Sequence, residues 1–160
     1  MEFLFVYGTL QDLQNQVAQF LQSNSEFYAD GYFHGKLFDL GDYPGAVKSD
    51  KSEDKVYGSV FALKNAELIF RILDEYEETG NQFAEPNEFI RTKTEIVVGK
   101  NEKLLCWIYL YNYPVDSGNQ IESGIFTPDV DWFWFLILLN LFMKSTAIKQ
   151  IAVGCGFRYT

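Results

Sequence analysis

The feature that most constrains the fold is a long segment, residues 27–40, that is rich in aromatic side chains and interrupted by glycine. Glycines stand at 31 and 35 within it and at 41 just after it. Glycine inside a strand is typical of a bulge or sharp bend, as found where a sheet curls into a barrel. We therefore predict one long bent strand, or a pair of strands. The chain also has fifteen Phe, ten Tyr and three Trp, whose rings can fill a compact barrel or sheet core.

Four further segments have the composition of strands. Residues 3–7 form a continuous apolar run that stops at Gly8, as expected of a strand buried on both faces. Segments 56–63, 89–98 and 104–111 are also predicted to be strands. Residues 99–102 make a hairpin-like turn between the last two. We expect another turn at 42–45 and an exposed charged loop at 48–55.

Two segments have the periodicity of helices. The first spans about 13–22 with Asp12 as its expected N-cap, and the second follows Asn65 as cap and ends at 79–81. Apolar residues at helical spacing continue through Tyr76, which makes the second helix the clearer of the two. Because two helices accompany several short strands without βαβ alternation, the predicted fold class is α+β in a single domain.

Composition excludes several classes of function. The formal net charge is −9 and no basic stripe offsets it, so nucleic-acid binding is not expected. Cys106 and Cys155 are far apart and His34 is the only histidine, so we expect no metal site. The sequence also has no P-loop and no Gly-rich dinucleotide fingerprint. The first residues lack a basic start and a cleavage site, which favours a cytoplasmic location.

The first candidate for chemistry is the loop of Tyr7, Gly8, Thr9 and Leu10 at the end of the first strand. A loop of this kind can direct several backbone N–H groups into one concavity, and such a nest binds a carboxylate. Gly8 would allow close approach of ligand and backbone. The alternative interpretation is an ordinary strand-end turn, which short glycine motifs often are.

The second candidate is Glu77, in an acidic stretch at the end of the second helix. It lies four residues after Leu73 and so borders the apolar face. We predict a raised pKa, because the helix dipole, Asp74 and Glu78 all disfavour the charged carboxylate. Such a group is suited to act as a general base. The alternative is that these acids form a solvated helix end.

Two further positions leave alternatives open. Arg91 either binds a substrate carboxylate or neutralises the acidic helix end. Trp107, Tyr109 and Tyr111 alternate along their strand and should share one face, which either lines a pocket or forms part of an aromatic core.

In this order along the chain, these motifs resemble the gamma-glutamylcyclotransferase-like family, which includes the gamma-glutamylamine cyclotransferases and many small bacterial proteins. The resemblance covers residues 3–124. The matching segments are F-V-Y-G-T-L at 5–10, Y-P-G at 43–45, V-Y-G-S-V at 56–60, L-D-E-Y-E-E at 73–78, F-I-R at 89–91 and W-I-Y at 107–109.

The resemblance implies a small mixed β-barrel with flanking helices and a cavity for a gamma-glutamyl group. It implies that Tyr7, Gly8, Thr9 and Leu10 bind the substrate and that Glu77 is the catalytic acid/base. The implied reaction releases 5-oxoproline and a free amine, without a cofactor. We add Arg91 and Tyr109 as candidate substrate-binding residues.

The chain departs from the family pattern in two places. Glu78 stands where the family commonly has glycine, which would alter the helix exit beside Glu77. The family-like domain spans 1–124, and residues 125–160 form an apolar C-terminal extension that the resemblance does not place. We consider a core helix, a homodimer interface, an interfacial membrane anchor or a non-native extension for it. Its apolar run is shorter than a membrane span requires.

Three functional hypotheses follow from the sequence. The first is cyclotransferase activity on a gamma-glutamyl amine or peptide. The second is another small-molecule activity in the same cavity, because one fold hosts many functions. The third is a non-catalytic module that binds a small molecule or a partner through the cavity or the apolar tail.

Overall fold

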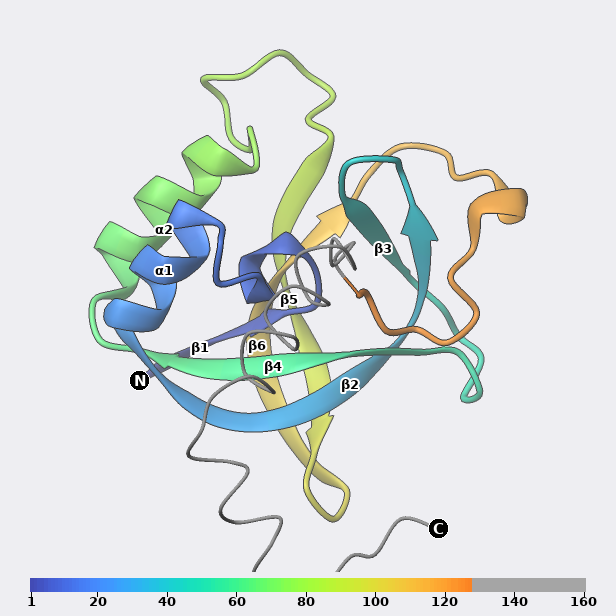
Figure 1. Ribbon diagram of the computed structural model, residues 1–160, viewed down its shortest axis with the longest axis horizontal. Helices are drawn as coiled ribbons and strands as arrows, with labels where there is room; N and C mark the ends of the chain where they lie inside the picture. Colours follow the sequence, from blue (N-terminus) through green and yellow to red (C-terminus); the bar gives the residue numbers. More distant parts are fainter. Residues whose placement is uncertain (128–160) are drawn as a thin grey trace, which may run out of the picture. The chain divides into compact units, whose positions relative to one another are not determined.

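The computed structural model describes residues 1–127, which include one compact unit, Met1–Phe126 (Figure 1). The expectations for the apolar segment beyond residue 127, and for Cys155, lie outside the described residues. Cys106 is fully buried in the barrel core. In the described part of the chain, no helix has the length and apolar character needed to cross a membrane.

The strands form a closed mixed β-barrel, as predicted. The ring runs β2-β4-β1-β6-β5 and closes where β5 pairs with β2, while β3 extends β2 at one end. Only β1 and β6 run parallel, and the other pairs are antiparallel. The strand bounds are β1 Glu2–Val6, β2 Ser25–Asp39, β3 Pro44–Lys48, β4 Lys55–Leu63, β5 Phe89–Val98 and β6 Glu102–Tyr111.

The glycine-containing segment is one long strand, β2, and it pairs with three others. Its first part pairs with β4, and at Gly35 its partner changes to β3. The register shift lies between Phe27 and Ala29, so the bulge does not fall at a glycine. Gly31 lies at the closure, opposite Gly58 of β4 and Val98 of β5. The glycines therefore mark the change of partner and the closing contact.

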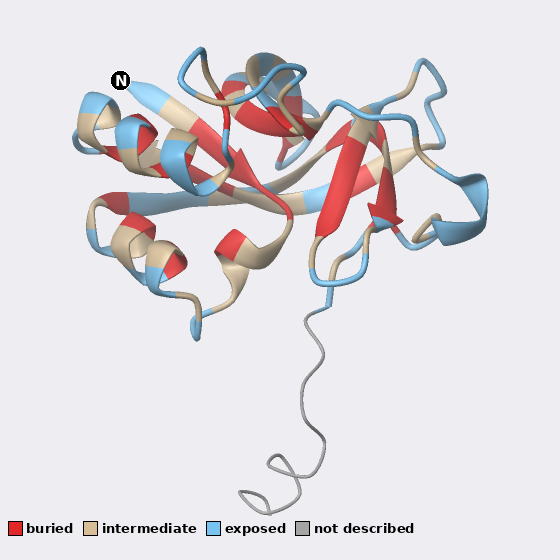
Figure 2. Cartoon of the chain, turned by 90° about the horizontal axis from the view of Figure 1, so that it is seen from above, coloured by how far each residue is buried: buried red, intermediate tan, exposed pale blue. Residues whose placement is uncertain are grey.

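Two apolar cores share the strand β1. Phe5 and Tyr7 face the barrel interior, whereas Leu4 and Val6 face a second cluster that includes side chains of both helices. Figure 2 shows the buried residues along the strands and on the inner sides of the helices. Both faces of β1 are therefore covered, which confirms the prediction of a doubly buried strand and explains its continuous apolar sequence.

The helices confirm one predicted cap and correct the other. Helix α2, Ala66–Tyr76, begins at Asn65, whose side chain accepts a hydrogen bond from the Leu68 N–H. Helix α1, Gln16–Ser23, is capped by Asn15 and not by Asp12 as predicted. The reason is a preceding 3₁₀ turn, η1 (Thr9–Gln11), which Asp12 closes by donating its N–H to the Thr9 carbonyl.

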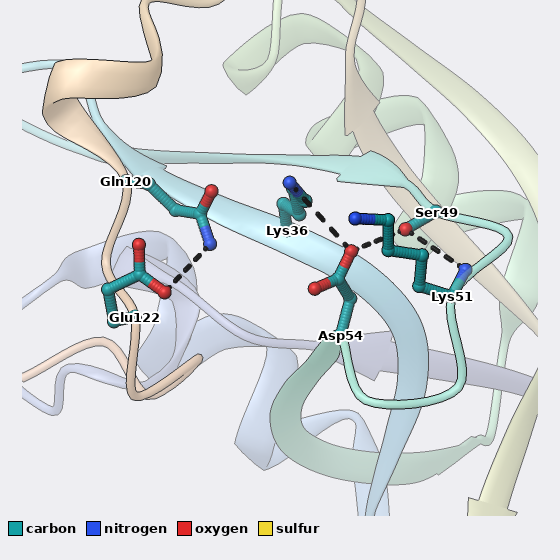
Figure 3. Close-up of polar contacts among 6 residues, drawn as sticks. All are labelled: Lys36, Ser49, Lys51, Asp54, Gln120 and Glu122. Atoms are coloured by element: carbon teal, nitrogen blue, oxygen red, sulfur yellow. Dashed lines mark hydrogen bonds and ion pairs between the residues drawn. The ribbon is translucent and has the colours of Figure 1, made fainter.

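The connections around β3 also differ in part from expectation. The predicted turn at 42–45 lies earlier, because the Leu40 N–H donates to the Tyr43 carbonyl and Pro44 already begins β3. The charged loop after β3 is ordered by Asp54, which accepts a hydrogen bond from Ser49 and pairs with Lys36 at 3.9 Å (Figure 3).

A short segment with a 3₁₀ turn, η2 (Ser117–Asn119), follows β6 and packs along β2. Gln120 bridges to Phe38 of β2, and the N–H of Ile121 donates to the Leu37 carbonyl at 2.8 Å. Gln120 also donates to Glu122 at 3.2 Å, as Figure 3 shows.

We predict that Gly58→Ala destabilises the protein by about 2 kcal/mol or more. A Cβ at this position would lie 2.1 Å from the carbonyl oxygen of Val6, so β1 would have to move. Urea denaturation monitored by fluorescence measures the change. Gly118→Ala is the control, because its Cβ would meet only Asp116 at 3.4 Å, and we expect a loss within about 0.5 kcal/mol. Equal losses for the two variants would contradict the close-approach argument.

Candidate active site

A cavity of about 570 Å³ opens beside the end of β1. A cavity of this size accommodates a small molecule. Its wall is assembled from segments that are far apart in the sequence. These segments are residues 5–10, Asn15, residues 42–44, residues 76–78, residues 88–89 and Tyr109.

The loop Tyr7–Leu10 lines this cavity, as the sequence predicted. Gly8 precedes the 3₁₀ turn η1, and no side chain caps that turn. The first N–H groups of a helical turn have no partner within it, so the N–H groups of Thr9 and Leu10 are left for a ligand or solvent. Gly8 packs against β3, since a Cβ there would lie 2.9 Å from Pro44 Cγ. The glycine therefore permits close packing of this loop on β3.

Tyr7 has a structural role in the cavity wall. Its buried hydroxyl donates to the Tyr109 carbonyl at 2.8 Å and accepts from the Ala46 N–H at 3.3 Å. Burial and the charge of Glu77 raise the pKa of Tyr7, which keeps the hydroxyl protonated. The side chain thus ties together the end of β1, β3 and β6 where the site loop begins.

Glu77 is the C-cap of helix α2, and a Schellman motif sets its position. The Thr79 N–H donates to the Asp74 carbonyl at 2.9 Å, and the Glu78 N–H donates to the Glu75 carbonyl at 3.4 Å. These are the two hydrogen bonds of a Schellman motif, in which the residue after the C-cap adopts a left-handed conformation. Glu78 occupies that position with φ of 48°. The chain therefore leaves the helix in the conformation that a glycine would adopt, although residue 78 is Glu.

Glu77 is half-buried in the cavity wall. No hydrogen bond or ion pair to its carboxyl group occurs within residues 1–127. Burial, followed by the charge of Glu88, raises the pKa of Glu77 to about 7. The predicted direction is confirmed, but Asp74 and Glu78, two of its expected sources, are not among the causes. Glu78 is exposed and Asp74 is paired elsewhere, so neither contributes.

The structure does not bring Arg91 into the cavity. Its Nε lies 3.1 Å from Asp74 Oδ1, and its guanidinium stacks on Phe70 and Trp107 at 4.2 and 5.0 Å from the ring centroids. Of the two predicted roles for Arg91, the structure shows neutralisation of the acidic helix end.

Tyr109 does line the cavity, and its hydroxyl donates to Asp74 Oδ1 at 2.8 Å. Burial and the Asp74 hydrogen bond raise the pKa of Tyr109. Trp107 and Tyr111 pack in the same cluster as Tyr109, so the predicted shared face is confirmed.

The cavity residues that were not predicted from the sequence include Asn15, Tyr43, Tyr76 and Glu88. The Tyr76 hydroxyl accepts from Asn15 Nδ2 at 2.8 Å and shares a 3.3 Å hydrogen bond with Thr9, which ties the site loop to both helices. Tyr43 donates from its hydroxyl to Glu88 Oε1 at 2.9 Å. Tyr43 belongs to the Y-P-G motif, which could have indicated it as a site residue. Glu88 is not part of any motif identified in the sequence.

The cavity is acidic. In the described chain it is lined by four carboxyl groups and by no Lys, Arg or His side chain, and these carboxyls belong to Asp42, Glu77, Glu78 and Glu88. No three His, Cys, Asp or Glu residues within residues 1–127 are arranged to hold a metal ion.

The closed mixed barrel and this cavity define a class of small barrel proteins with a buried carboxyl beside a strand-end loop. Residues 4–128 match the family model described as gamma-glutamyl cyclotransferase, AIG2-like, and the chain belongs to this family. YtfP of Escherichia coli K12, described as a gamma-glutamylcyclotransferase family protein, is 34% identical over 126 residues, which cover 76% of this chain and 92% of YtfP. A Citrobacter rodentium protein with the same description is 32% identical over 123 residues, covering 76% of this chain and 91% of that protein.

Solved structures share the fold. YkqA of Bacillus subtilis superposes with a TM-score of 0.58 at 24% identity, over 78% of this chain. The chain spans 39% of the length of YkqA. An AIG2-like protein of Mus musculus superposes with a TM-score of 0.54 at 20% identity, over 82% of this chain and 98% of the mouse protein.

We predict that Glu78→Gly stabilises the fold by roughly 0.5–1 kcal/mol. A side chain with a Cβ is strained at φ of 48°, and that relief outweighs the entropy that glycine loses on folding. Thermal denaturation measures the change. Glu78→Ala removes the charge but keeps the Cβ, so equal stabilisation by Ala would attribute the effect to charge repulsion instead.

We also predict a pH dependence of stability that Glu77→Gln removes. Because the folded pKa of about 7 is above the ordinary carboxyl value of 4.5, the native state binds the Glu77 proton more tightly than the unfolded state does. Stability is then lost as pH rises through this interval, by about 2–3 kcal/mol between pH 5 and 8. Urea denaturation of wild type and variant at both pH values measures the difference. Identical pH profiles would contradict a raised pKa.

Proposed function

We propose that this protein cyclises a gamma-glutamyl amine or peptide to 5-oxoproline and a free amine, with Glu77 as general acid/base. The observation that carries the proposal is a half-buried carboxyl, with a pKa raised to about 7, in a cavity that the loop Tyr7–Leu10 also lines. A carboxyl poised near neutral pH accepts and returns a proton readily. Membership of the gamma-glutamyl cyclotransferase family supports this reaction class.

The proposed reaction begins when Glu77 removes a proton from the alpha-ammonium group of the substrate. The resulting amine nitrogen attacks the gamma-carbonyl carbon and forms the new C–N bond of the five-membered lactam. The bond between that carbon and the leaving nitrogen then breaks. Glu77 returns its proton to the leaving nitrogen, and the second proton, which the attacking nitrogen loses as the lactam N–H forms, completes the leaving ammonium group. The positive charge of the substrate ammonium thus ends on the released amine, and no water is consumed.

Binding provides much of the acceleration in this scheme, because the nucleophile and the electrophile belong to one molecule. Holding the flexible chain in a folded conformation removes an entropic barrier. The N–H groups of Thr9 and Leu10 would anchor the substrate carboxylate or stabilise the oxyanion. The Tyr76 hydroxyl, which accepts a hydrogen bond from Asn15, also hydrogen-bonds the Thr9 side chain. These contacts support the loop that carries the N–H groups.

The proposal predicts that the wild-type protein forms 5-oxoproline from at least one member of a panel of gamma-glutamyl amines and dipeptides. We expect Glu77→Gln to reduce kcat by at least about 100-fold, since general-base catalysis is lost. Chromatographic assay of 5-oxoproline measures both. We further expect kcat/KM of the wild type to rise with pH through about 7, as Glu77 ionises.

Glu75→Gln is the matched control, because Glu75 is exposed on the same helix and does not line the cavity. It should retain wild-type activity. A folded wild-type protein that forms no 5-oxoproline from the whole panel would refute the proposed reaction. Activity that survives in Glu77→Gln would refute the role of Glu77.

A further inference from the structure

The carboxyl group of Glu88 is a second acid in the wall of this cavity. Glu88 precedes β5 directly and lines the cavity together with Glu77, which terminates α2. The charge of Glu88 disfavours ionisation of Glu77. Asp42 and Glu78, the other acids on the wall, are both exposed. Glu77 and Glu88 are thus the pair in the partly buried part of the site.

The structure holds Glu88 in place against this repulsion. The Tyr43 hydroxyl donates to Glu88 Oε1 at 2.9 Å, and the Glu88 backbone carbonyl accepts from the Asn112 N–H at 2.8 Å. Burial and the Glu88 hydrogen bond raise the pKa of Tyr43 to about 12, so that hydroxyl stays a donor. In the described part of the chain, Glu88 Oε2 has no hydrogen-bond or ion-pair partner, and this oxygen is left for a ligand.

Two carboxyls in one partly buried wall, both with free oxygens, attract a cation. No cationic side chain of residues 1–127 lines the cavity, and Arg91 is already paired with Asp74. A bound ammonium group would supply the missing positive charge through charge-assisted hydrogen bonds. The cavity itself, of about 570 Å³, is the independent indication of a ligand site, and the half-buried Glu77 carboxyl in the same wall also has no partner within residues 1–127.

We propose that Glu88, oriented by Tyr43, is a specificity-determining residue that binds the alpha-ammonium group of the substrate beside Glu77. This inference rests on the proposed function and assigns one part of its substrate to a residue. Glu77 then receives a proton from an ammonium group that Glu88 has positioned. Cyclisation turns this ammonium into a neutral lactam N–H, so Glu88 attracts the substrate and not 5-oxoproline. The carboxylate would therefore favour exchange of product for substrate.

The test compares two ligands that differ only in the ammonium group. They are the gamma-methylamide of L-glutamate and the monomethylamide of glutaric acid, which has no amine. Binding is measured by isothermal titration calorimetry in the Glu77→Gln background, which prevents turnover. We expect added Glu88→Gln to weaken binding of the amine-bearing ligand about tenfold and of the other ligand less than about twofold.

Two further variants sharpen the comparison. Tyr43→Phe leaves Glu88 unoriented, and we expect a smaller loss, about threefold, for the amine-bearing ligand alone. Glu85→Gln is the matched control, because Glu85 is an exposed acid three residues earlier that does not line the cavity, and it should change neither affinity. Circular dichroism and thermal denaturation verify that each variant is folded.

Equal weakening of both ligands by Glu88→Gln would assign Glu88 a purely structural role and overturn the inference. An unchanged affinity for both ligands would overturn it as well. If the wild-type protein produces 5-oxoproline while either of these results is found, the proposed function stands and only the role of Glu88 fails. If the wild-type protein neither binds nor converts any gamma-glutamyl compound, both fail together.

Discussion

Closure of the barrel by β2 is the constraint on which the rest of the structure depends. This strand pairs with β3, β4 and β5, and it reaches β5 only where Gly31 lets the two backbones approach. A Cβ at Gly31 would lie only 2.7 Å from the carbonyl oxygen of Val97. Gly58, directly opposite on β4, accommodates the Val6 carbonyl of β1 in the same way. Closure therefore fixes the end of β1, from which the site loop begins.

The cavity results from two adjacent chain ends that this closure brings together. β1 ends in the loop Tyr7–Leu10, and helix α2 ends in the Schellman motif that places Glu77. The helix packs its apolar face on the outside of the barrel, through fully buried Ile69 and Leu73. That packing, and not any polar contact, carries the carboxyl into a poorly solvated position. A buried acid reduces stability near neutral pH, a cost that functional sites commonly bear.

The charges around the cavity are arranged in two separate groups. On the outer side of β6, Arg91 neutralises Asp74, and Tyr109 links this pair to the cavity wall. Inside the cavity, the carboxyls of Glu77 and Glu88 have no cationic partner in the described chain. In the proposed function, the backbone N–H groups of Thr9 and Leu10 would be the complementary donors. Such a cavity would match a zwitterionic substrate, which carries both an ammonium and a carboxylate.

Local sequence determined those features whose physical cause is local. The apolar run at 3–7, the alternation at 107–111, the periodicity of α2 and its Asn65 cap each depend on neighbouring residues, and the structure agrees with all of them. Glu77 was identifiable for the same reason, because its place beside the apolar stripe follows from helical spacing. Tertiary structure alone decided that Arg91 faces away from the cavity and that Glu88 accompanies Glu77. Those outcomes depend on which distant segments meet when the barrel closes, and no periodicity within a single segment carries that information.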